Sequence, residues 1–363
     1  MKIFHIISNK VWGGGEQTVL DLARRQLQDG IDVELFCLPK PDIVERFREL
    51  GVPIHTLPLG GALDLKSAWQ MSRILKAQTD CIVHAHNFKE AFTAAYARVL
   101  ARRMDIRLVM CRNLTRRGKN SLIYRWLYRQ LDCIVFDSQV ALDEFLTTDP
   151  DIDHRKLSVI HNGIVVPEGI EPADVRSEFG IRPDEVLAIY HGRLDPEKGL
   201  DTVVEAVGLL PADCPLRVVL VGRGSDEYTD HLRSLIAERH LEGKIQLAGF
   251  RNPILPYVAA ADFGVLASIV AEGCSLSAQE HLALGHPVVA TNNGGQREYI
   301  VEGSNGLLVP PGDAKALALA MQRLVEQKDQ RLAMGRQART DFLDHMTYEH
   351  FYAKMRTIYE PSV

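Results

Sequence analysis

Two cations in the second half of the chain have the spacing of a phosphate-binding loop. Arg193 and Lys198 lie five residues apart in HGRLDPEKG, between a predicted strand and a predicted helix. An arginine binds a phosphate through a two-point fork and a lysine binds it as a point charge, so the pair fits a diphosphate. A solvated, charged turn would have the same composition, and the loop alone does not separate the two interpretations.

Two carboxylates flank the start of another predicted helix, in EGCSLSAQE. Glu272 lies in the loop, and Glu280 lies about two turns into the helix, which we expect to begin near Cys274. The amides of Cys274, Ser275 and Leu276 would then be free to bind an anion. The carboxylates could accept hydrogen bonds from sugar or ribose hydroxyls. Glutamates on helices are usually only solvated, but HLALGHPVVAT follows at once and leads into a buried strand.

A glycine-rich turn, WGGGEQT at residues 12–18, follows the first predicted strand. Bare backbone allows a ligand to approach closely, and a helix that begins near Glu16 would point free N–H groups at it. Thr18 stands where a dinucleotide fingerprint needs its third glycine, and no P-loop pattern is present, so we expect neither NAD nor a P-loop nucleotide here. The turn could also serve chain geometry alone. Glu16 has no role that the sequence assigns.

Two histidines end a predicted strand in HAHN, at residues 84–87. Either His84 or His86 could reach a ligand, and we expect the alternation of side chains along a strand to exclude one of them. His86 is nearer the carboxyl end of the strand and is the candidate. A histidine at the end of a strand can equally be structural.

Apolar segments alternate with helical patterns along the whole chain, which predicts an α/β protein with doubly wound parallel sheets. A linker, VVPEGIEPADV at residues 165–175, separates two such series. We therefore divide the chain into domains at 1–165 and 166–345. No strand follows the C-terminal helix at 346–363, which must pack on the outside of a domain, and we expect it to pack back on the first. The strands are predicted at residues 3–7, 33–38, 81–85, 107–110, 133–136 and 158–160, and then at 186–190, 217–221, 245–247, 263–266, 287–290 and 306–309.

Composition is that of a globular protein: 363 residues, 46% hydrophobic and 25% charged. The six cysteines form no CxxC pair, so we expect free thiols in a reducing cytoplasm. The first residues lack a basic region followed by a long apolar stretch, so no signal peptide is predicted. We expect a cytoplasmic protein, with peripheral association on the inner face of the membrane as a further expectation.

A basic segment at residues 98–129 holds ten Lys and Arg but one acid. It includes Arg112, Arg116, Arg117 and Lys119, followed by the apolar and aromatic stretch SLIYRWLY. Three interpretations stay open: an anionic membrane surface, an anionic acceptor, or an amphipathic helix packed on its own sheet. Nucleic acid is not expected, because no binding motif accompanies the charge and the chain has a net charge of −5.

The ordered set of motifs carries more weight than any one of them. GGGE, IHNGI, GRLDPEKG, EGCSLSAQE with ALGHPVVAT, and NGLLVPPGD occur in this order, and together the chain resembles family 4 of the retaining nucleotide-sugar glycosyltransferases. The resemblance covers almost the whole chain and is strongest at residues 159–313. It implies the GT-B fold, in which two Rossmann-like domains face each other across a cleft.

The resemblance also implies a role for each candidate in the second domain, which binds the donor. Arg193 and Lys198 would hold the diphosphate of a UDP- or GDP-linked sugar, and Glu280 would bind the ribose. Glu272 would contact the donor sugar near the reacting centre, with the amides of residues 274–276 beside it.

In the first domain, which takes the acceptor, Gly14 and Gly15 match the loop that faces the reacting centre, and His86 matches the family's active-site histidine. Gly15, His86 and Glu272 are therefore the implied catalytic residues. The chain departs from the family pattern at His281, where a small residue is common, and in GGQREYI, where a proline is more usual.

The implied reaction moves a sugar from a nucleoside diphosphate to an acceptor hydroxyl with retention of configuration, in the synthesis of a cell-surface polysaccharide, lipopolysaccharide or glycolipid. No protein nucleophile is evident, and the arrangement needs neither a metal nor a cofactor. Two alternatives remain: a nucleotide-sugar epimerase or hydrolase of the same fold, which uses no acceptor, and a non-catalytic subunit of a glycan-assembly complex.

Overall fold

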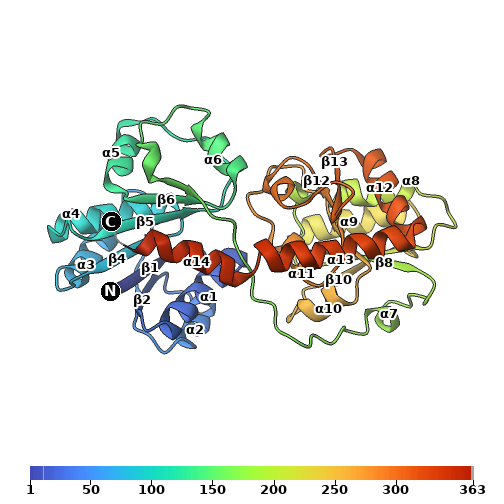
Figure 1. The fold of residues 1–363 in the computed structure, drawn as a ribbon, viewed down its shortest axis with the longest axis horizontal. Coiled ribbons are helices and arrows are strands. Elements are labelled where there is room, and N and C mark those ends of the chain that lie inside the picture. The colour runs from blue at the N-terminus through green and yellow to red at the C-terminus, as the bar shows by residue number, and fades with distance from the viewer. Residues whose placement is uncertain (11, 361–363) are drawn as a thin grey trace. The chain divides into compact units, whose positions relative to one another are not determined.

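The computed structural model describes residues 1–10 and 12–360 (Figure 1). The chain divides into two compact units: Met1–Asn162 with Glu349–Val363, and Gly163–Tyr348. The sequence placed these divisions at residues 165 and 346, a few residues from where the chain passes between units.

Unit 1 contains seven parallel strands in the order β3-β2-β1-β4-β5-β6-β7. Six of them lie where the apolar runs predicted strands. The seventh, β3, was not predicted: it has only three residues at the edge of the sheet, and Ile54 is its single apolar residue. The strands are β1 (Lys2–Ile7), β2 (Asp32–Cys37), β3 (Ile54–Thr56), β4 (Cys81–Ala85), β5 (Arg107–Arg112), β6 (Cys133–Phe136) and β7 (Leu157–Val159).

Helices cover both faces of this sheet, and the strands direct side chains to both faces, as β1 shows. Phe4 and Ile6 enter the larger core, whereas Ile7 enters a second core on the opposite face. The larger core holds α3 (Leu65–Leu75), α4 (Phe88–Ala101), α5 (Leu122–Gln130) and α6 (Gln139–Leu146), and the second holds α1 (Gly14–Gln28) and α2 (Pro41–Arg48).

The last helix, α14 (Tyr348–Tyr359), belongs almost wholly to unit 1. Arg107 on β5 donates hydrogen bonds of 2.8 to 3.1 Å to the backbone carbonyls of residues 358–360, which otherwise lack helical partners. Near the start of the helix, Glu349 pairs with Arg25 on α1, and the Tyr352 hydroxyl one turn later donates to Asp29 at 2.9 Å. Both ends of α14 are therefore tied to the first unit.

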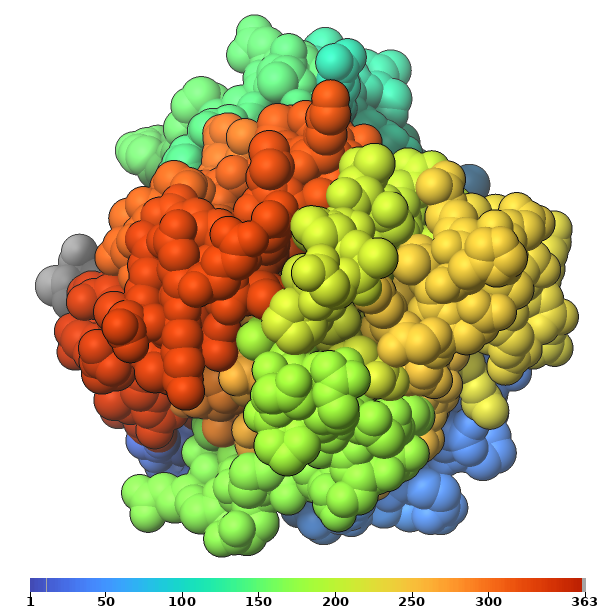
Figure 2. Space-filling model, turned by 90° about the vertical axis from the view of Figure 1, so that its right-hand side faces the viewer, coloured from blue at the N-terminus to red at the C-terminus, as the bar shows by residue number. Residues whose placement is uncertain are grey.

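Unit 2 contains six parallel strands in the order β10-β9-β8-β11-β12-β13, all of them predicted. The helices α8, α9 and α12 cover one face, and α10, α11 and α13 cover the other. Figure 2 shows part of the first layer, where the yellow-green surface near α8 adjoins the orange-red surface of α12. The strands are β8 (Val186–His191), β9 (Leu216–Val221), β10 (Ile245–Gly249), β11 (Phe263–Leu266), β12 (Val288–Thr291) and β13 (Gly306–Val309). The helices are α7 (Val175–Glu178), α8 (Leu200–Leu209), α9 (Asp226–Glu238), α10 (Leu255–Ala259), α11 (Leu276–Ala283), α12 (Ala314–Glu326) and α13 (Lys328–His345).

These two sheets confirm the predicted pair of Rossmann-like, doubly wound domains. In each sheet, the strand order reverses at one place, between β1 and β4 in unit 1 and between β8 and β11 in unit 2. Chain connections leave these pairs in opposite directions, so the carboxyl ends of the two strands are not covered by a crossover, and ligands of open α/β sheets bind there.

The cysteines are free, and Cys37, Cys81, Cys111 and Cys133 are buried, in agreement with the sequence. Among the residues described, no helix is both long enough and apolar enough to cross a membrane.

Candidate active site

Two loops meet at the carboxyl ends of β8 and β11 in unit 2. The first runs from the end of β8 to α8 and turns at Gly199, whose φ of +64° is left-handed. A β-carbon at Gly199 would lie 2.0 Å from the carbonyl oxygen of Ala267, so any other residue would push the loops apart. The amide of Ile269 also donates to the Glu197 carbonyl at 3.0 Å. The loop with the two cations is thereby fixed against the loop that leads to Glu272.

These loops bring Lys198 and Glu272 together. The Lys198 Nζ lies 3.0 Å from Glu272 Oε1, and both side chains are about one-fifth exposed. The Ser268 hydroxyl donates to the same carboxylate oxygen. Arg193, in contrast, is 70% exposed and contacts Asp195 at 3.1 Å. A pair this exposed contributes at most about 1 kcal/mol, so the Arg193 guanidinium can turn to an anion at little cost.

The first turn of α11 lies beside this pair in sequence and differs in detail from the prediction. The helix begins at Leu276, with Ser275 as its N-cap, and the Ser275 hydroxyl accepts from the Ala278 amide at 3.4 Å. The amide of Ser275 donates to the Tyr299 hydroxyl at 3.1 Å. The prediction of a free Ser275 amide is therefore wrong, because a tyrosine 24 residues later in the chain occupies it.

Glu280 extends from α11 toward the end of β8, where its Oε2 lies 3.3 Å from His191 Nε2. Burial raises the pKa of Glu280 to about 8 and lowers the pKa of His191 to about 4. At neutral pH the carboxyl group therefore keeps its proton and the imidazole is uncharged. This is a neutral polar pair, unlike the ion pair between Lys198 and Glu272.

The departure at His281 has a structural explanation. Its ring is fully buried behind the site, and a β-carbon at Gly264 on β11 would lie 2.5 Å from it. A glycine on the strand thus makes room for a large side chain on the helix. The missing side chain at Gly264 offsets the volume of the His281 ring, so the imidazole fits between β11 and α11.

In unit 1, the glycine-rich turn leads into α1, which begins at Gly14. The carboxylate of Glu16 is buried, accepts from the Gly13 amide at 2.9 Å and also accepts from the Asn9 side chain. Glu16 thus caps the helix and holds the preceding loop, as in a capping box. This gives the residue the role that the sequence left unassigned.

Packing within this unit does not require a glycine at position 15. Gly14 and Gly15 are exposed, and neither has a positive φ. A β-carbon at Gly15 would meet no atom within 4 Å. Space for a side chain therefore exists, and the bare backbone is free for contact with a ligand.

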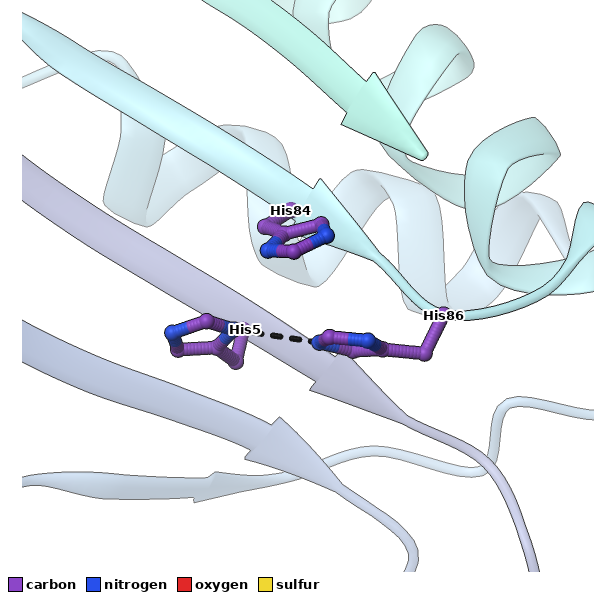
Figure 3. Close-up of side chains that lie close together, drawn as sticks. All are labelled: His5, His84 and His86. Atoms are coloured by element: carbon purple, nitrogen blue, oxygen red, sulfur yellow. Dashed lines mark hydrogen bonds between the residues drawn. The ribbon is translucent and has the colours of Figure 1, made fainter. Parts of the chain in front are cut away.

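At the end of β4, His84 and His86 point to the same side, with ring centroids 4.2 Å apart (Figure 3). The expectation that strand alternation separates them is wrong, because residues two apart share a face. Burial distinguishes them instead: His84 is fully buried and His86 is partly exposed. His5 on β1 completes the cluster, with its Nδ1 3.1 Å from His86 Nε2.

The nitrogens of these three rings are of the type that binds zinc, and one ligand atom from each lies within 4.8 Å of the others. They already have hydrogen-bond partners: Tyr359 and Cys111 contact His84 at 2.9 and 3.0 Å. Burial lowers the pKa of all three histidines, so they are neutral at pH 7.

Sequence reasoning missed Glu90, which joins the two loops that follow β1 and β4. This buried carboxylate accepts from the amides of Ser8 and His86 and from the Asn87 side chain, each at 2.6 Å. Burial raises the pKa of Glu90 to about 7. The spacing N-x-x-E at residues 87–90 is a helix-capping signal that could have identified it.

The basic candidates divide into two kinds. Arg112 is buried, donates to the carbonyls of Leu114 and Arg116, and lies 4.9 Å from the rings of Phe88 and Phe145. It holds its own loop, so its predicted place on a membrane- or acceptor-binding surface is corrected. The structure leaves three of the four candidates exposed: Arg116, Arg117 and Lys119.

Two family models match the chain, one in each unit. The model described as Glycosyltransferase Family 4 matches residues 12–166, and the model described as Glycosyl transferases group 1 matches residues 173–341. In each sheet, the place where the strand order reverses is called the switch point: β1/β4 in unit 1 and β8/β11 in unit 2. The matched segments contain the candidate residues of both switch points.

Curated relatives have the same class of activity in their names. The UDP-Gal:alpha-D-GlcNAc-diphosphoundecaprenol alpha-1,3-galactosyltransferase of Escherichia coli is 24% identical over 356 residues, 90% of this chain and 89% of that protein. The lipopolysaccharide core biosynthesis glycosyltransferase LpsE of Rhizobium meliloti is 29% identical over 209 residues, 57% of this chain and 58% of that protein.

Solved structures share the fold over the full length. HepE of Anabaena, crystallised with UDP, superposes with a TM-score of 0.84 at 20% identity and 99% coverage of both chains. A glycosyltransferase from Rickettsia africae gives a TM-score of 0.85 at 20% identity, covering 99% of this chain and 97% of that one. The two sheets, the two family models and these relatives agree, and the chain belongs to the family 4 glycosyltransferases with the GT-B fold.

Proposed function

We propose that this chain is a retaining glycosyltransferase that moves a sugar from a nucleoside diphosphate to an acceptor hydroxyl. The observation that carries the proposal is the Lys198–Glu272 pair at the β8/β11 switch point. The Lys198 Nζ and Glu272 Oε1 lie 3.0 Å apart on loops fixed to each other, which supports a cation for phosphate beside a carboxylate for sugar hydroxyls.

The second unit binds the donor in this proposal. Lys198 leaves Glu272 for the diphosphate, and Arg193 turns from Asp195 to the same group. The first turn of α11 adds the positive end of its dipole. These groups stabilise the negative charge that grows on the diphosphate as it departs, which is the largest catalytic contribution in sites of this type.

The freed Glu272 carboxylate then accepts hydrogen bonds from the donor sugar, and Glu280 accepts them from the ribose. The bond between the anomeric carbon and the diphosphate oxygen breaks, and a bond to the acceptor oxygen forms on the same face. The acceptor hydroxyl gives its proton to the departing diphosphate, so no protein nucleophile takes part.

The first unit takes the acceptor, with Gly14, Gly15 and His86 at the β1/β4 switch point. The relatives act in lipopolysaccharide core synthesis or on a diphosphoundecaprenol-linked sugar. We infer an acceptor of the same class, a saccharide attached to a lipid. UDP is bound in the structure of the similar protein HepE, and a UDP- or GDP-linked hexose is the proposed donor here.

An acceptor attached to a lipid requires the protein to work at a membrane surface. Leu122 at the start of α5 is 82% exposed, and Leu114 is 57% exposed. They accompany the exposed cations Arg116, Arg117 and Lys119 in the same segment. Exposed apolar side chains surrounded by cations are typical of protein surfaces that bind anionic lipid headgroups.

The Lys198→Met variant tests the donor site. We expect transfer to fall by about 100-fold or more, because the departing diphosphate loses its fixed cation. Lys315→Met, which removes an exposed lysine from α12 in the same unit, is the matched control. Transfer is measured with radiolabelled nucleotide sugars, and circular dichroism shows whether both variants fold. Normal transfer in the folded Lys198 variant would contradict the assignment.

The raised pKa of Glu280 predicts a pH dependence of donor binding. Ribose hydroxyls donate more strongly to an ionised carboxylate than to a neutral carboxyl group, so binding favours release of the proton that Glu280 holds below about pH 8. Affinity for UDP or GDP should therefore rise between about pH 7 and about pH 9. Below the pKa of Glu280, the affinity rises by at most about tenfold per pH unit. His191, with a pKa of about 4, does not titrate in this range.

Calorimetry in two buffers of different ionisation enthalpy measures the released proton directly. Glu280→Gln should bind more weakly and release no proton. An affinity of the unaltered protein that is flat or falls over this range would refute the role of Glu280.

The Gly15→Ala variant separates folding from ligand approach. Alanine near the start of a helix is expected to leave stability unchanged or raise it by up to about 1 kcal/mol, since the site has space for a methyl group. Transfer should nevertheless fall, because the methyl group covers the bare backbone. Gly243→Ala, at another glycine with no atom within 4 Å of a β-carbon, is the control. Equal activity of both variants would leave Gly15 without a role in the reaction.

Vesicle flotation tests the membrane surface. The protein should float with vesicles rich in phosphatidylglycerol at low salt, and high salt should release it. Replacing Arg116, Arg117 and Lys119 together by glutamine should abolish flotation and leave transfer to a soluble acceptor intact. A protein that does not float with anionic vesicles at low salt does not bind membranes through this segment.

A further inference from the structure

A chain of hydrogen bonds runs from His86 into the interior of unit 1. His86 Nε2 lies 3.1 Å from Nδ1 of His5, and His5 Nε2 lies 2.8 Å from Oε1 of Gln26 on α1. His5 and Gln26 are fully buried. Figure 3 shows the ring of His86 directed at that of His5 across the ends of β1 and β4. The partly exposed histidine of this cluster is thus bonded to His5 and, through His5, linked to a Gln26 amide that solvent does not reach.

The direction of these bonds determines where the protons are. Burial keeps His5 and His86 neutral, so each ring has one N–H. The Oε1 of Gln26 can only accept, so the proton of His5 is on Nε2. The Nδ1 of His5 then has no proton and can only accept from Nε2–H of His86. The remaining nitrogen of His86, Nδ1, is left with a lone pair.

We propose that His5 and Gln26 are positioning residues that fix the tautomer of His86, so that His86 presents an unprotonated Nδ1 to the substrate. A nitrogen in this state accepts a hydrogen bond from a hydroxyl or amide N–H group and repels a phosphate or carbonyl oxygen. This inference rests on the proposed function and deepens it: the group bound by His86 is a hydroxyl or acetamido N–H of a sugar.

Gln26 selects between two opposite arrangements. In the structure its carbonyl oxygen faces His5, and its Nε2 has no hydrogen-bond partner among the residues described. If the amide were reversed, Nε2 would donate to His5, His5 would donate to His86, and His86 would present a protonated Nδ1. The orientation of one buried amide therefore decides whether His86 accepts or donates.

The third histidine of the cluster provides a control, because it lies outside this chain of bonds. Both nitrogens of His84 have other partners, the Tyr359 hydroxyl at 2.9 Å and the Cys111 thiol at 3.0 Å. Tyr359→Phe removes a buried hydrogen bond beside the cluster but leaves the bonds from Gln26 to His86 in place.

The test is the ¹⁵N spectrum of the histidine rings in the full chain, in which His86 is identified by the signals lost in His86→Asn. We expect the protonated-type shift at Nε2 and the lone-pair-type shift at Nδ1, with no donor present. Gln26→Met should convert this pattern to a mixture of tautomers and lower kcat about 10- to 100-fold with little change in KM. Tyr359→Phe should change neither.

Gln26→Glu, recorded at a pH at which the introduced carboxyl group is ionised, has only acceptor oxygens against His5 and should restore the pattern of the unaltered protein, which excludes a folding defect as the cause. A protonated Nδ1 in the unaltered protein, or an unchanged pattern in Gln26→Met, would overturn the proposal. So would stoichiometric binding of zinc through these rings, since a metal would replace the bond between His5 and His86. The spectra need no substrate, so this result is independent of whether the chain transfers a sugar.

Discussion

Each unit of this protein depends on one pair of neighbouring strands whose chain connections leave in opposite directions. These pairs are β1/β4 and β8/β11. Parallel strands end at one edge, and no crossover covers that edge where the winding reverses. Loops that follow the two strands must therefore be held together by contacts of their own. Glu90 joins them in unit 1 through the amides of Ser8 and His86; in unit 2, Glu272 pairs with Lys198 and the Ile269 amide donates to the Glu197 carbonyl.

The two carboxylates of the donor site are prepared for different partners. Glu272 shares a partly exposed ion pair with Lys198, so a diphosphate can take the cation and leave the carboxylate for hydroxyls. Glu280 is about one-fifth exposed too, but it faces the buried imidazole of His191 instead of a cation, and both groups are neutral at pH 7. Burial raises the energy of the charged form of Glu280 until hydroxyl donors arrive to stabilise it. The ion pair of Lys198 and Glu272 is thus in place before the diphosphate binds, whereas the negative charge of Glu280 forms only when the ribose hydroxyls bind.

The strands and the residues that cap helices could be predicted because a short stretch of sequence is enough to identify each of them. Apolar runs gave six strands in each unit, and capping spacings would identify Glu16 and Glu90. Contacts between distant segments were not predictable: the Ser275 amide is occupied by Tyr299, and Arg112 is enclosed by the aromatic rings of Phe88 and Phe145. These depend on side-chain packing, which no sequence period encodes. The expectation that strand alternation separates His84 from His86 was an error of a different kind. Side chains two residues apart along a strand point to the same face, so this pattern was already present in the sequence.

The central claim is that the nucleoside diphosphate binds to the loops after β8 and β11. Hydrogen–deuterium exchange of the full chain, with and without UDP or GDP, tests it most directly. The account predicts slower exchange in residues 192–199 and 274–278, because bound phosphates and ribose hold these loops and the first turn of α11. Protection confined to the glycine-rich turn at residues 12–18, with the loops of unit 2 unchanged, would contradict it.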